Sequence, residues 1–127
     1  MVQSPKLLLA LVGVSWLVAG PALAEGDPAK GRKVFARCKA CHEVDSEKNS
    51  LGPHLVGIVG RNAASVADFS YSPALQEAEI VWDEATLDQW LSNPKGFLPG
   101  NRMTYPGLMK ADDRQDLIAY LREPIAE

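Results

Sequence analysis

Two cysteines and a histidine lie close together in the segment Cys38-Lys39-Ala40-Cys41-His42. Thiols three residues apart share one face of a helical turn, and the imidazole that follows is aimed at a nearby point. This spacing suits covalent attachment of haem, because the thiols can add to its two vinyl groups while the imidazole reaches the iron. We therefore predict one haem c, bound through Cys38 and Cys41, with His42 as an iron ligand.

Three other uses of these residues stay open on the motif alone. A thiol-disulfide redox pair would use both cysteines, although that chemistry is typical of a βαβ setting, which this sequence does not predict. A zinc site would recruit His42 and His54, although the adjacent Cys41 and His42 would share one tetrahedral ion with difficulty. A structural disulfide would explain the thiols and leave His42 without a role.

The side of the iron opposite His42 decides between electron transfer and ligand chemistry. The candidates for that position are Met103, Met109 and His54. Met103 lies in the irregular segment 99–103, which can present a thioether from the far side of a haem. Methionine is also a common core residue, so spacing alone does not choose among the three.

The elements that must position these residues are three predicted helices, over residues 28–39, 84–91 and 112–122. Each begins beside an aspartate that suits an N-cap, namely Asp27, Asp83 and Asp112. Apolar residues recur at spacings of three and four within each segment, and Asn93-Pro94 is expected to end the second helix.

Two long segments, 43–66 and 94–107, hold too much glycine and proline for regular structure, and 69–75 favours only a short helical turn. Loops of this length inside a compact domain need a reason, such as a large apolar cofactor that they enclose. The sequence therefore predicts an all-α fold with long loops wrapped around one covalently bound haem.

The charge balance excludes some classes of function. The 127 residues include 13 Lys and Arg and 16 Asp and Glu, which gives a formal net charge of −3. That balance offers no positive field for nucleic acid, and 46% hydrophobic residues is too many for a disordered tail. We predict one globular, monomeric domain.

The first residues are typical of a secretory signal peptide. Lys6 precedes an apolar run over 7–19, and Ala22-Leu23-Ala24 offers the small residues that a signal peptidase reads. The run is shorter than the ~20 apolar residues of a membrane-spanning helix. We expect cleavage of residues 1–24, which would leave 25–127 as a soluble domain in the periplasm.

A series of short motifs covers residues 27–122. They are Gly31 with Phe35, Gly52-Pro53-His54-Leu55, Gly60-Arg61, residues 69–74, Trp82, Asn93-Pro94-Lys95, Pro99-Gly100 with Met103, and residues 116–121. In this order and spacing, the chain resembles the class I cytochromes c, small soluble mono-haem electron-transfer proteins of mitochondria and bacteria. The resemblance implies the small cytochrome c fold, in which the N- and C-terminal helices cross.

The resemblance also implies roles for single residues. It makes Met103 the second axial ligand, and it makes the Pro53 carbonyl the acceptor of a hydrogen bond from the His42 ring, which orients that ligand. The residues implied to bond the haem propionates are Arg61, Tyr71 and Trp82. The chain departs from the family pattern at Leu75, Trp90 and Asn101, near the sulfur and the inner propionate, which affects the expected potential.

Ligation by His and Met favours a raised potential and leaves no open position, so the resemblance implies an electron carrier and not an enzyme. Basic residues flank the segments that supply the ligands; they are Arg37, Lys39, Lys95 and Arg102. In the family, such residues dock acidic surfaces of a quinol-cytochrome c oxidoreductase, a terminal oxidase or a reaction centre.

Two other functions remain as alternatives. The electron-accepting subunit of a periplasmic dehydrogenase would form a lasting complex and would need a substantial apolar patch. A haem peroxidase would need Met103 to leave the iron easily.

Overall fold

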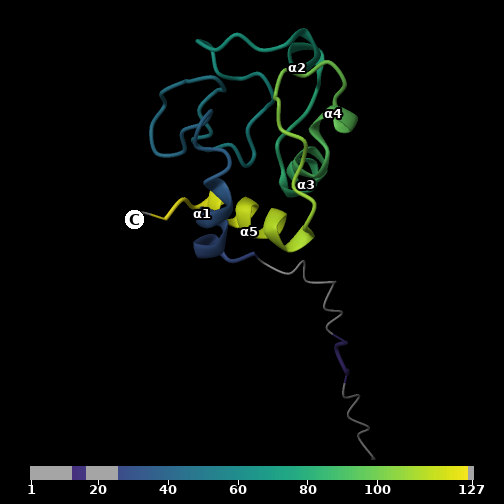
Figure 1. Cartoon of the computed structure of the whole chain (residues 1–127). Helices are drawn as coiled ribbons and strands as arrows, with labels where there is room; N and C mark the ends of the chain where they lie inside the picture. The colour runs from purple at the N-terminus through teal and green to yellow at the C-terminus, as the bar shows by residue number, and fades with distance from the viewer. Residues whose placement is uncertain (1–12, 17–25, 126–127) are drawn as a thin grey trace, which may run out of the picture.

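The computed structural model describes residues 13–16 and 26–125. In these residues the helices are α1 (Pro28–Phe35), α2 (Pro73–Glu77), α3 (Glu84–Ser92), α4 (Pro94–Phe97) and α5 (Ala111–Arg122) (Figure 1). The β structure in the same residues is one isolated antiparallel bridge, between Asn62 and Val81. The prediction of an all-α fold with long loops is confirmed.

The predicted signal peptide, residues 1–24, lies outside the described residues except for 13–16. Its cleavage therefore stays a prediction. Within the described part of the chain, no helix has the length and apolar character needed to cross a membrane.

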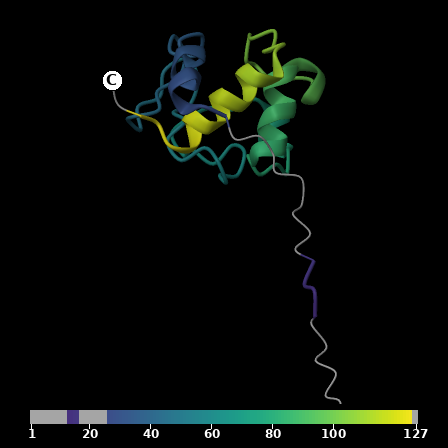
Figure 2. The same cartoon turned by 90° about the horizontal axis from the view of Figure 1, so that it is seen from below.

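Helices α1 and α5 cross in contact with each other, as Figures 1 and 2 show from two directions. Gly31 lies at the crossing, where a Cβ would meet the backbone of Asp116 and would lie 2.8 Å from Cβ of Tyr120. Phe35 packs on Tyr120 with ring centroids 5.4 Å apart, and the Asp27 N–H donates to the Asp116 carboxylate at 2.8 Å. The crossing implied by the family resemblance is thus present.

Helix α1 begins as predicted but ends earlier. Asp27 accepts hydrogen bonds from the first turn, and Pro28 takes the first helical position. Beyond Phe35, three-residue bonds such as Cys38 N–H to Phe35 O at 2.8 Å and Cys41 N–H to Cys38 O at 3.1 Å are mixed with four-residue bonds such as His42 N–H to Cys38 O at 3.0 Å. The prediction of α-helix over 36–39 was therefore wrong, and the motif lies in a series of tight turns.

Helix α3 follows the prediction closely. The Asp83 carboxylate accepts from the Thr86 N–H at 2.8 Å, while the Asp83 N–H donates to the Thr86 hydroxyl at 2.9 Å. The helix ends at Ser92, directly before Asn93-Pro94. Helix α5 differs at its start, because it begins at Ala111 and places Asp112 in the first turn and not at the cap.

Two short helices differ from the prediction. Helix α2 covers 73–77 and not 69–75, because Ser72 accepts from the Leu75 N–H and Pro73 takes the first position. Helix α4 falls in a segment predicted to be irregular. There the Asn93 side chain accepts from the Gly96 N–H at 3.0 Å and caps a new helix. Pro94, which was expected to end α3, is therefore also the first residue of α4.

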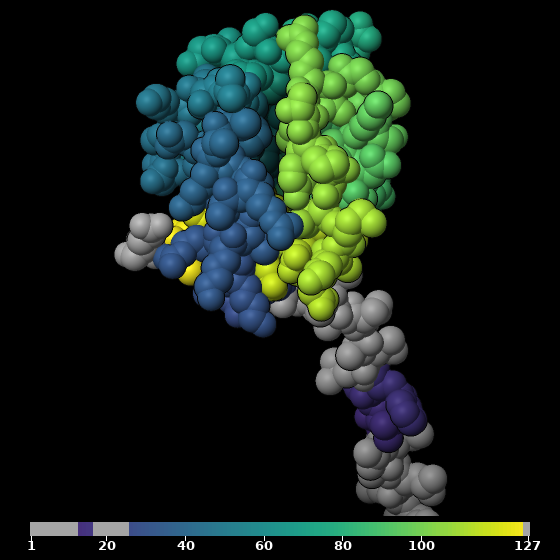
Figure 3. Space-filling model, viewed as in Figure 1, coloured from purple at the N-terminus to yellow at the C-terminus, as the bar shows by residue number. Residues whose placement is uncertain are grey.

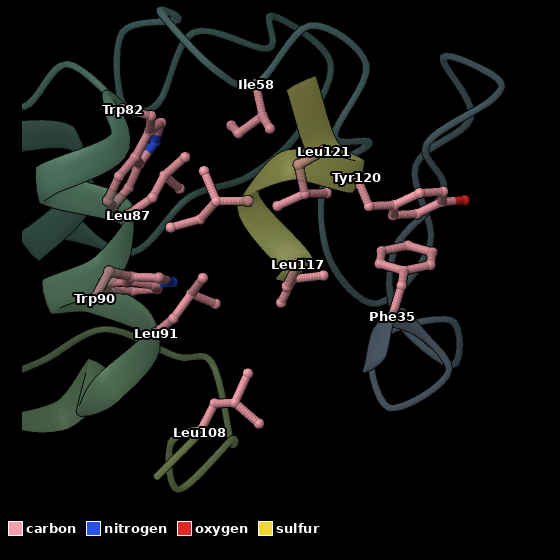
Figure 4. Packing of buried hydrophobic residues seen from close by; sticks show 11 residues of the cluster. Phe35, Ile58, Trp82, Leu87, Trp90, Leu91, Leu108, Leu117, Tyr120 and Leu121 are labelled. Atoms are coloured by element: carbon pink, nitrogen blue, oxygen red, sulfur yellow. The ribbon is translucent and has the colours of Figure 1, made fainter. Parts of the chain in front are cut away.

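The buried core joins α1, α3, α5 and the loops, with side chains that project toward one another in Figure 4. Its members are Phe35, Ile58, Trp82, Leu87, Trp90, Leu91, Leu108, Leu117, Ile118, Tyr120 and Leu121. Two ion pairs, Arg114 with Asp88 and Arg122 with Glu84, also join α5 to α3. This framework surrounds the cavity described next.

Candidate functional site

A cavity of about 570 Å³ lies between the turns after α1 and the segment that follows α4. Figure 3 shows it as a cleft between the blue atoms near residue 40 and the yellow-green strip near residues 100–107. Most of its wall is apolar and comes from the core. The side chains of Cys38, Cys41, His42 and Met103 all line it.

His42 is held firmly on one wall. Its Nδ1 donates to the Pro53 carbonyl oxygen at 2.7 Å, the contact implied by the family resemblance. Gly52 packs against the ring, and its N–H donates to the Cys41 carbonyl at 2.9 Å. Burial lowers the pKa of His42 below its ordinary value. A lowered pKa favours the neutral ring, and the bond from Nδ1 to Pro53 then leaves Nε2 as the acceptor nitrogen, the form in which imidazole binds a metal.

The two cysteines are half-buried and unpaired. Burial raises the pKa of the Cys38 thiol to about 11. A redox pair needs a thiolate of lowered pKa, so the environment of Cys38 does not favour that alternative. Among the described residues, no group of three or more His, Cys, Asp or Glu side chains is arranged to hold a metal ion, which the zinc alternative would need.

The three candidates for the second iron ligand lie in different places. Met103 is half-buried and lines the cavity. Met109 is 88% exposed and lies outside the lining of the cavity. His54 accepts from the Val56 N–H through Nδ1 at 3.3 Å and lines a second, smaller hollow. Of the three, Met103 is the one in reach of a group held in the cavity.

The residues implied to bond the propionates also meet at this cavity; they are Arg61, Tyr71 and Trp82. Arg61 donates to the carbonyls of Val56 at 2.9 Å and His54 at 3.0 Å, while its buried Nε has no partner in the described structure. A buried guanidinium donor without an acceptor needs one from elsewhere, and a carboxylate suits it best. Together with the apolar wall, this orphaned donor shows that the residues present fit a haem.

A family model described as cytochrome c matches residues 28–123. The chain belongs to the cytochrome c family. As a member of this family, the cytochrome carries a single covalently bound haem c and serves as a mono-haem electron carrier.

Individual relatives agree with this assignment. The cytochrome is 44% identical to cytochrome c2 of Rhodomicrobium vannielii, over 89% of its own length and 91% of the relative. It is 42% identical to cytochrome c-554 of Methylosinus trichosporium, over 95% of its length and 93% of the relative. Its fold matches the structure of cytochrome cH from Methylobacterium extorquens with a TM-score of 0.72 and 46% identity, covering 76% of this chain and 97% of the other.

The structure separates the four basic residues that the sequence grouped together. All four are exposed, and Arg37 and Arg102 line the cavity, whereas Lys39 and Lys95 do not. Two residues gain roles that the sequence did not reveal. Gly52 makes room for the His42 ring, and Asn101 bonds the backbone of Met103. The signal for Asn101 was present, since it is one of the departures from the family pattern.

Proposed function

We propose that the cytochrome is a mobile one-electron carrier in the periplasm, with His42 and Met103 as the axial ligands of its iron. The observation that carries this proposal is that one apolar cavity is lined by both cysteines, His42 and Met103. Haem, when bound, supplies a couple between ferrous and ferric iron. Occupation of both axial positions would leave no site for substrate.

The side chains around the cavity have three tasks in this proposal. Cys38 and Cys41 would hold the haem through thioether bonds, and Pro53 keeps the proton of His42 on Nδ1 so that Nε2 is available. Arg61, Tyr71 and Trp82 would satisfy the propionates. The apolar wall excludes water, so few dipoles must reorganise when the charge on the site changes.

The first test is the absorption spectrum of the exported protein, oxidised and reduced, before and after acid-acetone extraction. We expect haem that resists extraction, and a weak red band of sulfur-bound ferric iron that disappears in Met103→Ala. Met109→Ala is the matched control, because it removes a methionine that is 88% exposed and should keep the band. Persistence of the band in Met103→Ala would refute the ligand assignment.

Export is tested on the same material by intact mass. Cleavage after residue 24 predicts a chain that starts at Glu25 and carries the mass of one haem. A mass that includes residues 1–24 would contradict the proposed processing.

We also propose that the exposed basic residues around the cavity dock acidic surfaces of redox complexes. Arg102 lines the cavity beside Met103, and Lys95 lies on α4, directly before the loop that carries Met103. Such rim charges act mainly on the rate of encounter and are screened by salt. The partner classes are a quinol-cytochrome c oxidoreductase, a terminal oxidase, a reaction centre or a periplasmic dehydrogenase.

Charge reversal tests this docking surface. Lys95→Glu with Arg102→Glu is expected to slow reduction by the partner at low salt, with the difference shrinking as salt is added. Lys30→Glu with Lys33→Glu is the control, since it makes the same change in net charge on exposed positions of α1, far from α4 in Figure 1. Equal rates for the two double variants at low salt would exclude the proposed surface.

A further inference from the structure

We propose that Asn101 is a positioning residue for Met103, holding the loop that presents the thioether against the end of α4. This inference rests on the proposed function, in which Met103 is the second iron ligand. Its basis is a set of three hydrogen bonds made by a single side chain.

The Asn101 amide bonds both sides of its loop. Its Nδ2 donates to the carbonyl of Pro94 at 2.9 Å and to the carbonyl of Leu98 at 2.8 Å. Its Oδ1 accepts from the backbone N–H of Met103 at 2.9 Å. The side chain is half-buried, so these bonds are partly shielded from competing water. One amide therefore links the first residue of α4 directly to the residue that carries the sulfur.

The chemistry of the three partners fixes the orientation of this amide. Two carbonyl oxygens can only accept, so they must face the nitrogen, and the Met103 N–H can only donate, so it must face the oxygen. An aspartate at position 101 has no donor for the carbonyls of Pro94 and Leu98. An alanine makes none of the three bonds. The site is thus specific for a carboxamide of this length.

The other end of the linkage is anchored in the core. Pro94 is fully buried, and Phe97 of α4 packs edge-on against Trp90 of α3 with ring centroids 6.3 Å apart. The Leu98 N–H ends α4 by donating to the Pro94 carbonyl. The same carbonyl also accepts the hydrogen bond from the Asn101 amide. Asn101 therefore attaches the Met103 segment to a rigid support.

The segment of Met103 has little other support from its backbone. In the described chain, backbone-to-backbone bonds reach it at its two ends, from Asn101 N to Leu98 O at 3.2 Å and from Leu108 N to Leu91 O at 2.7 Å. Between these points, the bond from Asn101 to the Met103 N–H is the one that fixes the position of the ligand. Loss of the amide should allow the loop, and the sulfur with it, to move away from the iron more often.

The test measures how often Met103 leaves the iron. Imidazole added to the ferric protein binds only when the sulfur has left, so its apparent affinity reports the open fraction. We expect Asn101→Ala to tighten apparent imidazole binding roughly ten- to a hundredfold, the range for losing hydrogen bonds of this kind. Asn101→Thr, which keeps one donor and one acceptor in a milder change, should fall between the wild type and Asn101→Ala.

Asn49 provides a matched control. Its amide also bonds in two directions, donating to Asp68 at 3.0 Å and accepting from the His54 N–H at 2.9 Å, but it lies in the loop on the His42 side. Asn49→Ala should change imidazole affinity by less than about twofold while lowering the urea midpoint, because the variant loses both amide hydrogen bonds. If Asn101 had a purely structural role, Asn101→Ala would likewise lower the urea midpoint and leave the imidazole affinity almost unchanged.

The outcomes separate this inference from the proposed function. If Asn101→Ala and Asn101→Thr bind imidazole no more tightly than Asn49→Ala, while Met103→Ala has lost its sulfur band, the positioning role is refuted and the ligand assignment stands. If Met103→Ala keeps the band, the ligand assignment itself fails, whatever Asn101 does.

Discussion

The two walls of the cavity that carry the proposed iron ligands are held in different ways. On the His42 side, the backbone closes around the ligand through Gly52 N–H to Cys41 O at 2.9 Å and Leu55 N–H to Glu43 O at 2.7 Å. The Pro53 carbonyl holds the ring itself. On the Met103 side, the Asn101 side chain supplies the central contact. If His42 and Met103 are the iron ligands, as proposed, this comparison predicts that Met103 is the ligand that exchanges and that His42 stays fixed.

The largest loss in the free energy of unfolding is expected from a substitution on the His42 wall. A Cβ at position 52 would lie 2.8 Å from Nδ1 of His42 and nearer still to Cε1, so Gly52→Ala forces the ring off its Pro53 acceptor. We expect a loss of about 3 kcal/mol in the free energy of unfolding, as for overpacking of a fixed core group. Urea titration measures it, and a loss as small as that of a surface substitution would show that this wall is not rigid.

A smaller effect is expected from the support of the Met103 wall. Phe97→Ala removes the edge-on contact with Trp90 and is expected to cost about 2 kcal/mol, because the ring is half-buried. Apparent imidazole affinity should rise in the same variant. In Gly52→Ala it should rise less, because the sulfur should leave the iron less often than in Phe97→Ala. Equal imidazole binding by the two variants would remove the distinction between the walls.

The cap of α4 sharpens the comparison further. Asn93→Ala removes the acceptor for the Gly96 N–H and is expected to cost about 1 kcal/mol. Helix α4 and the residue after it carry the carbonyls that Asn101 bonds. The weak red band of sulfur-bound ferric iron should therefore be lost at a lower urea concentration than the concentration that unfolds the haem pocket as a whole. Coincident transitions for the band and for helical circular dichroism would argue against this local weakening.

The smallest expected effect depends on pH and lies in α3. Hydrogen bonds from the Thr86 N–H and hydroxyl lower the pKa of Asp83 below its ordinary value of 3.8. A carboxyl with a lowered folded pKa stabilises the protein above its unfolded pKa, and this stability is lost as the pH falls through the folded value. Asp83→Asn should therefore lower the thermal midpoint at about pH 7 more than at about pH 3, and the difference should shrink further as the pH falls below that.

The sequence predicted the elements whose signals are local. Asp27-Pro28 and Asp83 mark the starts of α1 and α3 because a cap and its acceptor bonds involve neighbouring residues. The placement of Cys38, Cys41 and His42 on one cavity also followed from spacing. In contrast, α4 was missed because Asn93-Pro94 ends one helix and begins another, and the choice depends on burial of Pro94 against the core.

Contacts between distant segments were the part that sequence reasoning could not supply. The resemblance implied the bond from His42 to Pro53, but nothing local showed that Gly52 lies against the ring. Asn101 was visible as a departure from the family pattern, yet its bond to Pro94 exists only once α4 has formed. Roles of this kind depend on tertiary geometry, and spacing along the chain does not encode them.

The crossing of α1 and α5 has a consequence in terms of chain entropy. Most of the residues that line the cavity lie within a single loop that runs from Gly31 to Asp116, whose two ends meet where α1 crosses α5. The entropy of closing a flexible loop grows only logarithmically with its length, by about 0.6 kcal/mol for each doubling. Inserted residues in the turns between the helices would thus disturb the fold little, whereas a single methyl group at the crossing would push the ends of the loop apart.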